Sequence, residues 1–232
     1  MPELILGPLL RFAGGSEATI WVETAAACEV LGCSSPTFRV GSHHYALVHV
    51  TGPEGACRYE VRLDGEKVWP EAGSPFPPGV IRPMRDGETL KLAFESCRIS
   101  APHEPPYTLS HREDERGLGI DALYATAMEL KDRPSGDLPH ALVLLGDQVY
   151  AHTPPFDTLR FTWGRRDTTE PPGEVVADFE EYARIYRDAW SDPALPLPRG
   201  GRPLPRERRA AGVGGGGQGR PGGDEPEAQG MA

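Results

Sequence analysis

The first 86 residues alternate apolar and polar positions in short runs, which is the pattern of half-buried β-strands. In the first run, Ile20 and Val22 share one face and Trp21 lies on the other. Asp64-Gly65 separates the last two runs, and this dipeptide is the most typical connection of a tight β-hairpin. The predicted strands are residues 18–24, 44–50, 58–63 and 66–69.

Gly and Pro separate these strands at short intervals, which favours a β-sandwich over residues 1–86. A tryptophan in an early strand, Trp21, and a tyrosine in a late one, Tyr59, are compatible with the core of an immunoglobulin- or fibronectin-like sandwich. Another small antiparallel sheet is the alternative interpretation. Residues 71–79 are rich in proline and predict a stiff connection to the C-terminal half of the chain.

From residue 90 onwards, strand patterns alternate with helix patterns. Apolar residues from Gly119 to Leu130 recur at helical spacing. The run Ala141–Leu145 is continuously apolar, as in a strand that is buried on both faces. The elements expected here are a strand at 90–94, a helix at 119–130, a strand at 141–145 and a helix at 175–189. This order is typical of an α/β domain, which we predict over residues 87–193.

Glycine and proline, 28 and 25 of the 232 residues, are concentrated in residues 194–232. Arginine is also frequent in this segment, and no aromatic residue occurs in it. Such a segment cannot bury enough apolar surface to offset the entropy of ordering it. A disordered Gly/Pro/Arg-rich tail is therefore predicted.

The net charge of −10 argues against a general nucleic-acid-binding protein and against a protein of anionic membrane surfaces. No apolar run approaches the length that spans a bilayer, and the N-terminal residues lack the pattern of a secretory signal. We therefore expect a cytoplasmic location. There the four cysteines are expected to be reduced rather than paired in disulfides. They are Cys28, Cys33, Cys57 and Cys97.

Two predicted strands are followed by residues that can bind a metal. The first continues as Phe94-Glu-Ser-Cys-Arg98 and the second as Leu145-Gly-Asp-Gln-Val-Tyr150. In an open α/β sheet, ligands bind beyond the carboxyl ends of the strands. Asp147 could bridge two metal ions there, Tyr150 could return to the same place, and a Cys97 thiolate would favour a transition metal.

Each of these residues also has a simpler structural interpretation. Asp147 could cap the following turn, Cys97 could be a small buried apolar residue, and Tyr150 could be an ordinary half-buried aromatic. His152 is the only histidine close to the second motif, and His43 is expected at the surface beside a strand.

The two motifs, about fifty residues apart, resemble those of the alkaline phosphatase D (PhoD-like) family of metallophosphatases. The resemblance extends over residues 3–193 and includes further segments, some of which look like a bacterial cytoplasmic branch of the family. These segments are Tyr59–Gly65, Pro102–Tyr107, Arg166–Gly173, Asp178–Tyr182 and Tyr186–Trp190.

The resemblance implies a β-sandwich over residues 1–86, followed over 87–193 by the first part of a calcineurin-like metallophosphatase domain with a four-layer αββα architecture. It also implies hydrolysis of phosphate mono- or diesters by a metal-bound hydroxide, at a dinuclear centre of Fe³⁺ and Ca²⁺ or another divalent metal. Cys97 and Tyr150 match the family's ferric ligands, and Asp147 matches the catalytic carboxylate that bridges the metals.

The chain also departs from the family. Glu95 stands where the family usually has glycine, and His152 stands where it has an aspartate after the ligand tyrosine. Beyond residue 193 the family continues with another carboxylate motif, an asparagine and histidine ligands, whereas residues 194–232 resemble nothing in it. We interpret this change as a truncation or a shifted reading frame.

The sequence therefore predicts a phosphoric ester hydrolase with weak metal binding and impaired activity. We expect a phosphate ester substrate, and no specific nucleic-acid or membrane partner. A second class of function is a binding module, in which the β-sandwich binds and the metallophosphatase remnant is inactive. A third is another small α/β protein in which Cys97 and Asp147 are structural.

Missing neighbouring strands would leave apolar surface of the 141–145 strand exposed.

Overall fold

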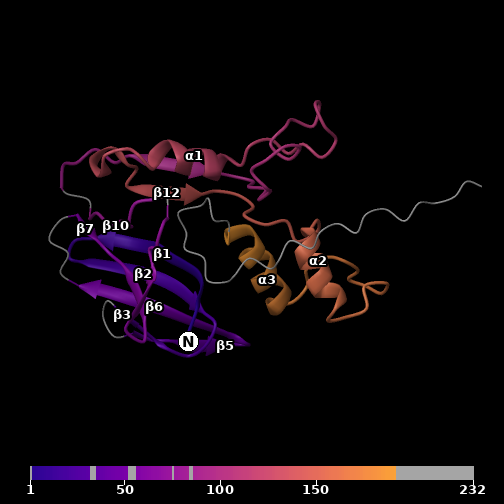
Figure 1. The fold of residues 1–232 in the computed structure, drawn as a ribbon, viewed down its shortest axis with the longest axis horizontal. Helices are drawn as coiled ribbons and strands as arrows, with labels where there is room; N and C mark the ends of the chain where they lie inside the picture. The colour runs from indigo at the N-terminus through magenta and orange to yellow at the C-terminus, as the bar shows by residue number, and fades with distance from the viewer. Residues whose placement is uncertain (1, 32–34, 52–55, 75, 84–85, 192–232) are drawn as a thin grey trace, which may run out of the picture. The chain divides into compact units, whose positions relative to one another are not determined.

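The structure of the chain is a computed structural model in which residues 2–31, 35–51, 56–74, 76–83 and 86–191 are described (Figure 1). All of these residues belong to one unit of the chain, residues 1–201. The expectation of a disordered tail over 194–232 lies outside the described residues, as does Cys33.

The first antiparallel sheet contains the longest strands of the described chain and has the order β1-β2-β6-β5. Its strands are β1 (Leu4–Gly14), β2 (Glu17–Thr24), β6 (His43–Thr51) and β5 (Phe38–Val40). β2 pairs with β6 in a register that places Ile20 opposite Val48 and Val22 opposite Ala46. The apolar residues of the predicted alternation therefore share one face of this sheet.

The second antiparallel sheet has the order β4-β3-β8-β9. Its strands are β4 (Ser35–Pro36), β3 (Glu29–Leu31), β8 (Val61–Leu63) and β9 (Glu66–Trp69). The predicted hairpin is confirmed, because Leu63 pairs with Glu66 across the two-residue turn. Asp64 and Gly65 adopt positive φ angles of 47° and 87°, as this class of turn requires. A separate two-stranded pair joins β7 (Cys57–Arg58) to β10 (Val80–Ile81).

Both four-stranded sheets contribute to one hydrophobic core. Ile20 and Val22 of the first sheet and Val61 and Leu63 of the second are all buried in the same cluster. Burial of such side chains contributes about 2 kcal/mol each relative to exposure. An N-terminal β-rich region of antiparallel sheets is therefore confirmed.

The core tryptophan is Trp69 rather than Trp21. Trp69 is buried, and the ring of Tyr59 stacks on it with 5.1 Å between ring centroids. Trp21 is only half-buried and stacks on Tyr45 at 5.7 Å. The alternation of β2 explains the difference, because Trp21 points away from the face that carries Ile20.

Between residues 86 and 191, which the structure describes, the α/β part contains a parallel pair of strands and three α-helices. The strands are β11 (Leu92–Glu95) and β12 (Ala141–Leu144). The helices are α1 (Ala122–Leu130), α2 (Phe156–Trp163) and α3 (Phe179–Trp190), with a short 3₁₀ turn η1 (Ser135–Asp137). α1 and α3 begin later than predicted, because the side chains of Asp121 and Asp178 cap their N-termini. α2 was not predicted.

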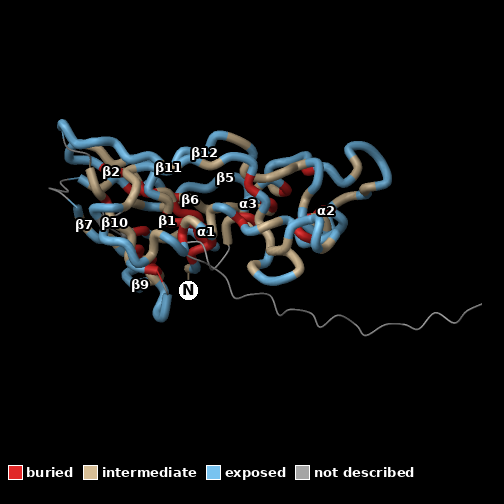
Figure 2. The backbone as a smooth tube through the Cα atoms, turned by 90° about the horizontal axis from the view of Figure 1, so that it is seen from above, coloured by how far each residue is buried: buried red, intermediate tan, exposed pale blue. Residues whose placement is uncertain are grey.

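The expectation that β12 is buried on both faces is wrong. All four of its residues are exposed (Figure 2). The following Leu145 is 66% exposed. In the described part of the chain, β12 pairs only with β11, whose Phe94 is 75% exposed. The apolar surface predicted to remain uncovered is therefore present.

Within the described residues, no helix combines the length and the apolar character that crossing a membrane requires.

Candidate functional site

The two strand ends that carry the predicted site lie next to each other. Because β11 and β12 run parallel, with Glu95 opposite Leu144, their carboxyl ends meet at one edge. The backbone N–H of Leu145 donates to the carbonyl of Glu95 at 2.7 Å, which extends the pairing by one step. Beyond it, the N–H of Arg98 donates to the carbonyl of Asp147 at 2.9 Å. The loops that contain Cys97 and Asp147 are thus joined by a backbone hydrogen bond.

Gly146 allows this close approach of the two loops. A Cβ atom at this position would lie 2.1 Å from Oγ of Ser96 and 3.3 Å from Sγ of Cys97. The first distance is far below any van der Waals contact. A larger residue at this position, two residues after β12, would have to displace the hydroxyl of Ser96, and the glycine of the Gly-Asp motif avoids this contact.

The thiol of Cys97 is exposed and hydrogen-bonded. Its Sγ lies 3.2 Å from Oγ of Ser96. Hydrogen bonds with Ser96, with Tyr150 and with the backbone of Asp147 hold the pKa of the Cys97 thiol below its ordinary value. The negative charge of Asp147 acts in the opposite direction. The simpler interpretation of Cys97 as a buried apolar residue is wrong.

Tyr150 belongs to the same cluster. Its hydrogen bond to Cys97, followed by partial desolvation and the negative charges of Cys97 and Asp147, raises the pKa of the Tyr150 phenol. The three residues predicted from sequence are therefore brought together, with Cys97 in contact with the other two.

The donor types of this cluster fit a transition metal better than Mg²⁺ or Ca²⁺, because a thiolate is a soft ligand. Cys97, Asp147 and Tyr150 would supply sulfur, carboxylate and phenolate. Among the described residues, no group of three or more His, Cys, Asp and Glu side chains is placed to hold a metal ion. The cluster contains two residues of those types, and its third donor is a tyrosine. That these residues ligate a metal stays a prediction.

Three charged residues next to the cluster were not predicted. Arg98 and Asp121 form a buried ion pair, with 2.9 Å between Nη2 and Oδ2. Glu95 is half-buried, and its desolvation together with the charge of Asp121 raises the pKa of its carboxyl, against the effect of Arg98. The position of Arg98, directly after Cys97, was the available signal in the sequence. Its partner lies 23 residues away and could not be inferred from spacing.

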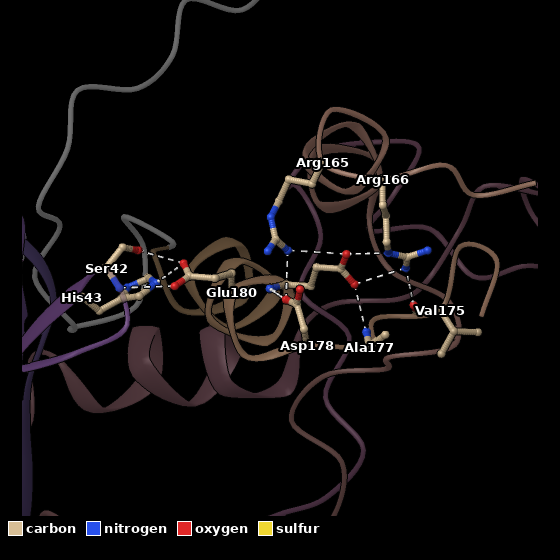
Figure 3. A network of polar contacts seen from close by, with 9 residues as sticks. Ser42, His43, Arg165, Arg166, Val175, Ala177, Asp178 and Glu180 are labelled. Carbon is tan, nitrogen blue, oxygen red and sulfur yellow. Dashed lines mark hydrogen bonds and ion pairs between the residues drawn. The ribbon is translucent and has the colours of Figure 1, made fainter. Parts of the chain in front are cut away.

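A second polar cluster joins the first sheet to α3. His43 was expected at the surface, but its side chain is 11% exposed and lies between two carboxylates. Nδ1 is 2.6 Å from Oε1 of Glu23. Nε2 is 2.9 Å from Oε2 of Glu180, to which the hydroxyl of Ser42 also donates (Figure 3). A cavity of about 180 Å³ adjoins this cluster and is also lined by Arg187. Because its acidic and basic groups pair with one another, we interpret this cluster as structural.

Comparison with known proteins finds a similarity in one region of the chain. The model of a family described as a domain of unknown function (DUF7800) matches residues 1–81. No curated protein and no solved structure matches the chain. The matched segment contains the strands from β1 to β10 and ends before β11. The similarity therefore concerns the β-rich region and not the cluster of Cys97, Asp147 and Tyr150.

Proposed function

We propose that the chain carries part of the active site of a phosphoric ester hydrolase of the alkaline phosphatase or phosphodiesterase type, with impaired activity. The observation that supports this proposal is that backbone hydrogen bonds join the loops of Cys97 and Asp147 at the carboxyl edge of two parallel strands. In this proposal, β11, β12 and the helices are the first part of a calcineurin-like metallophosphatase domain. The two antiparallel sheets are a fibronectin- or immunoglobulin-like sandwich.

Each residue has a separate role in this proposal. Cys97 and Tyr150 would hold Fe³⁺, and Asp147 would bridge it to Ca²⁺ or another divalent metal. Such a centre supplies Lewis-acid polarisation of a phosphoryl oxygen. The exposure of Cys97 and Asp147 leaves the cluster open to a phosphate ester.

Proton release is the step that this chain's own residues control. A metal requires the deprotonated thiol and phenol, so binding releases their protons and becomes tighter as the pH rises. The lowered pKa of Cys97 favours this step, and the raised pKa of Tyr150 opposes it. Three donors do not complete a dinuclear centre, which is why we expect weak binding and slow turnover.

Metal content and ester turnover test the proposal together. The purified chain is loaded with ferric iron, and its hydrolysis of bis(p-nitrophenyl) phosphate and p-nitrophenyl phosphate is measured. We expect bound iron and slow turnover, both lost in Asp147→Asn and retained in Asp132→Asn, a control at an exposed aspartate after α1. A wild-type chain that binds no iron would contradict the proposal.

A binding module is the second candidate, because the family match is confined to residues 1–81 and these residues contain their own core. In that case the β-rich region carries the function. Absence of iron and of turnover from the full chain, with a fragment of residues 1–86 that folds cooperatively, would favour this candidate over the hydrolase.

A further inference from the structure

We propose that Arg98 is a positioning residue, which holds Cys97 in its metal-binding conformation through a buried ion pair with Asp121. This inference rests on the proposed metal site and adds to it a residue that does not touch the metal.

Cys97 has a backbone conformation that an L-residue rarely adopts. Its φ angle is 60°, in the left-handed region that favours glycine. The other non-glycine residue with positive φ in the described chain is Asp64, which lies in a hairpin turn. Such a conformation is disfavoured and persists only where the surrounding structure imposes it. The residues on either side of Cys97 must therefore be fixed.

The side chain of Arg98 supplies this fixation on one side. It is 1% exposed, and its Nε donates to Oδ2 of Asp121 at 3.0 Å. Nη1 donates to the carbonyl of Ala189 at 2.7 Å, and the guanidinium lies 5.3 Å from the ring centre of Trp190. The planar guanidinium thus connects the loop after β11 with the N-terminus of α1 and the C-terminal end of α3.

The backbone N–H of Arg98 fixes the same residue relative to the loop after β12, because it donates to the carbonyl of Asp147 at 2.9 Å. One residue is therefore held at both its side chain and its N–H group. The peptide between Cys97 and Arg98 cannot rotate to relax the φ angle of Cys97 without breaking one of these contacts. The orientation of Sγ toward Tyr150 and Asp147 depends on this peptide.

The two carboxylate oxygens of Asp121 have different hydrogen-bond partners. Oδ1 accepts the backbone N–H groups of Leu123 and Tyr124 and caps α1, whereas Oδ2 faces Arg98. Asparagine caps helices as well as aspartate does. Asp121→Asn therefore retains the cap and removes the charge that pairs with Arg98.

The test uses the full chain with Co²⁺ as the probe, because thiolate-to-cobalt charge transfer in the near ultraviolet reports a bond to sulfur. Wild type, Arg98→Lys and Asp121→Asn are titrated with Co²⁺ below their unfolding temperatures, and Cys97→Ser identifies the band that depends on Cys97. Lysine keeps the charge but not the planar fork. We expect about 10-fold or greater loss of Co²⁺ affinity and a weaker band in both variants, as for other residues that orient metal ligands.

Arg166→Lys is the matched control, because Arg166 also pairs with a buried carboxylate, that of Glu181, but does not contact Cys97. This variant should lower the melting temperature and leave the cobalt band unchanged. Where Arg98→Lys does not fold, Asp121→Asn carries the test. A folded variant of Arg98 or Asp121 with wild-type affinity and band overturns the positioning role alone. A wild-type chain without a Cys97-dependent band overturns the metal site and the positioning role with it.

Discussion

Gly146 and Ser96 are so close that a single methyl group at position 146 would lie 2.1 Å from the hydroxyl oxygen of Ser96. This relationship brings the loop after β11 into contact with the loop after β12. It also makes the geometry of the cluster testable without any metal.

Gly146→Ala should destabilise the chain by about 1–3 kcal/mol, because a well-packed contact cannot accept the added group. Adding Ser96→Ala removes the hydroxyl and should recover part of this loss. Gly136→Ala is the control, since nothing lies within 4 Å of a Cβ at that position, and its effect should stay within about 0.5 kcal/mol. Thermal unfolding measures all three. Equal effects of the two glycine substitutions would contradict the close approach.

Cys97 should react with iodoacetamide at a lower pH than an ordinary cysteine, because its pKa is lowered by its hydrogen bonds with Ser96 and Tyr150. Site-resolved mass spectrometry of the native chain measures the pH profile. Cys28 is an internal comparison, since burial raises its pKa. Ser96→Ala and Tyr150→Phe should each move the Cys97 profile to higher pH. A profile unchanged by both substitutions would show that the sulfur does not accept these hydrogen bonds.

Glu181 should contribute to stability in a pH-dependent manner. Its side chain is fully buried, and two hydrogen bonds from Arg166, at 2.7 and 3.2 Å, lower the pKa of its carboxyl. The contribution is therefore complete above the unfolded-state pKa, about 4.3, and is lost as the pH falls through the lower folded-state pKa. Glu181→Gln should cost about 3 kcal/mol at pH 7 and less in acid.

Unfolding in denaturant between pH 3 and 7 measures this difference. Glu129→Gln is the control, because Glu129 forms an exposed pair with Arg133 and should contribute well under 1 kcal/mol. A Glu181→Gln variant whose loss of stability is the same at pH 3 and pH 7 would contradict the ion pair.

The uncovered strand pair should bind hydrophobic dyes. Phe94 is 75% exposed, so Phe94→Thr should change stability by no more than about 0.5 kcal/mol while lowering ANS fluorescence. Leu63→Thr replaces a side chain that is 1% exposed and should cost several kcal/mol, roughly the range of core truncations. A loss of stability in Phe94→Thr comparable to that in Leu63→Thr would mean that Phe94 is covered.

Strands with strict alternation could be predicted from the sequence, and the others could not. The Glu66–Trp69 strand is observed as predicted, and β2 and β6 extend only slightly beyond their predicted bounds. β1 was missed because Leu4 to Pro8 reads as a continuous apolar run without alternation. The run 58–63 is divided because it changes partners: Arg58 pairs with β10, whereas Val61–Leu63 pairs with β3 and β9.

The missed helix has a physical explanation too. α2 follows Pro155, which provides no side-chain cap, and its fully buried residues are Thr158 and Thr162. Its apolar residues Phe156, Leu159 and Trp163 recur at helical spacing, but Phe156 and Trp163 are exposed, so the apolar stripe is not the face that packs.

The convergence of Cys97 and Tyr150 could be anticipated, because parallel strands place their carboxyl ends at one edge. The contacts that support them could not. Arg98 reaches Ala189, 91 residues away, and His43 reaches Glu180, 137 residues away. Such contacts depend on how the helices pack, which the local pattern of residues does not encode.

The measurement that tests the central claim most directly is resonance Raman spectroscopy of the chain loaded with ferric iron, excited in the tyrosinate-to-iron charge-transfer band. The account predicts tyrosinate vibrations that disappear in Tyr150→Phe and an iron–sulfur vibration that disappears in Cys97→Ser. Ferric iron bound with the same spectrum in both variants, or no bound iron in the wild-type chain, would contradict it.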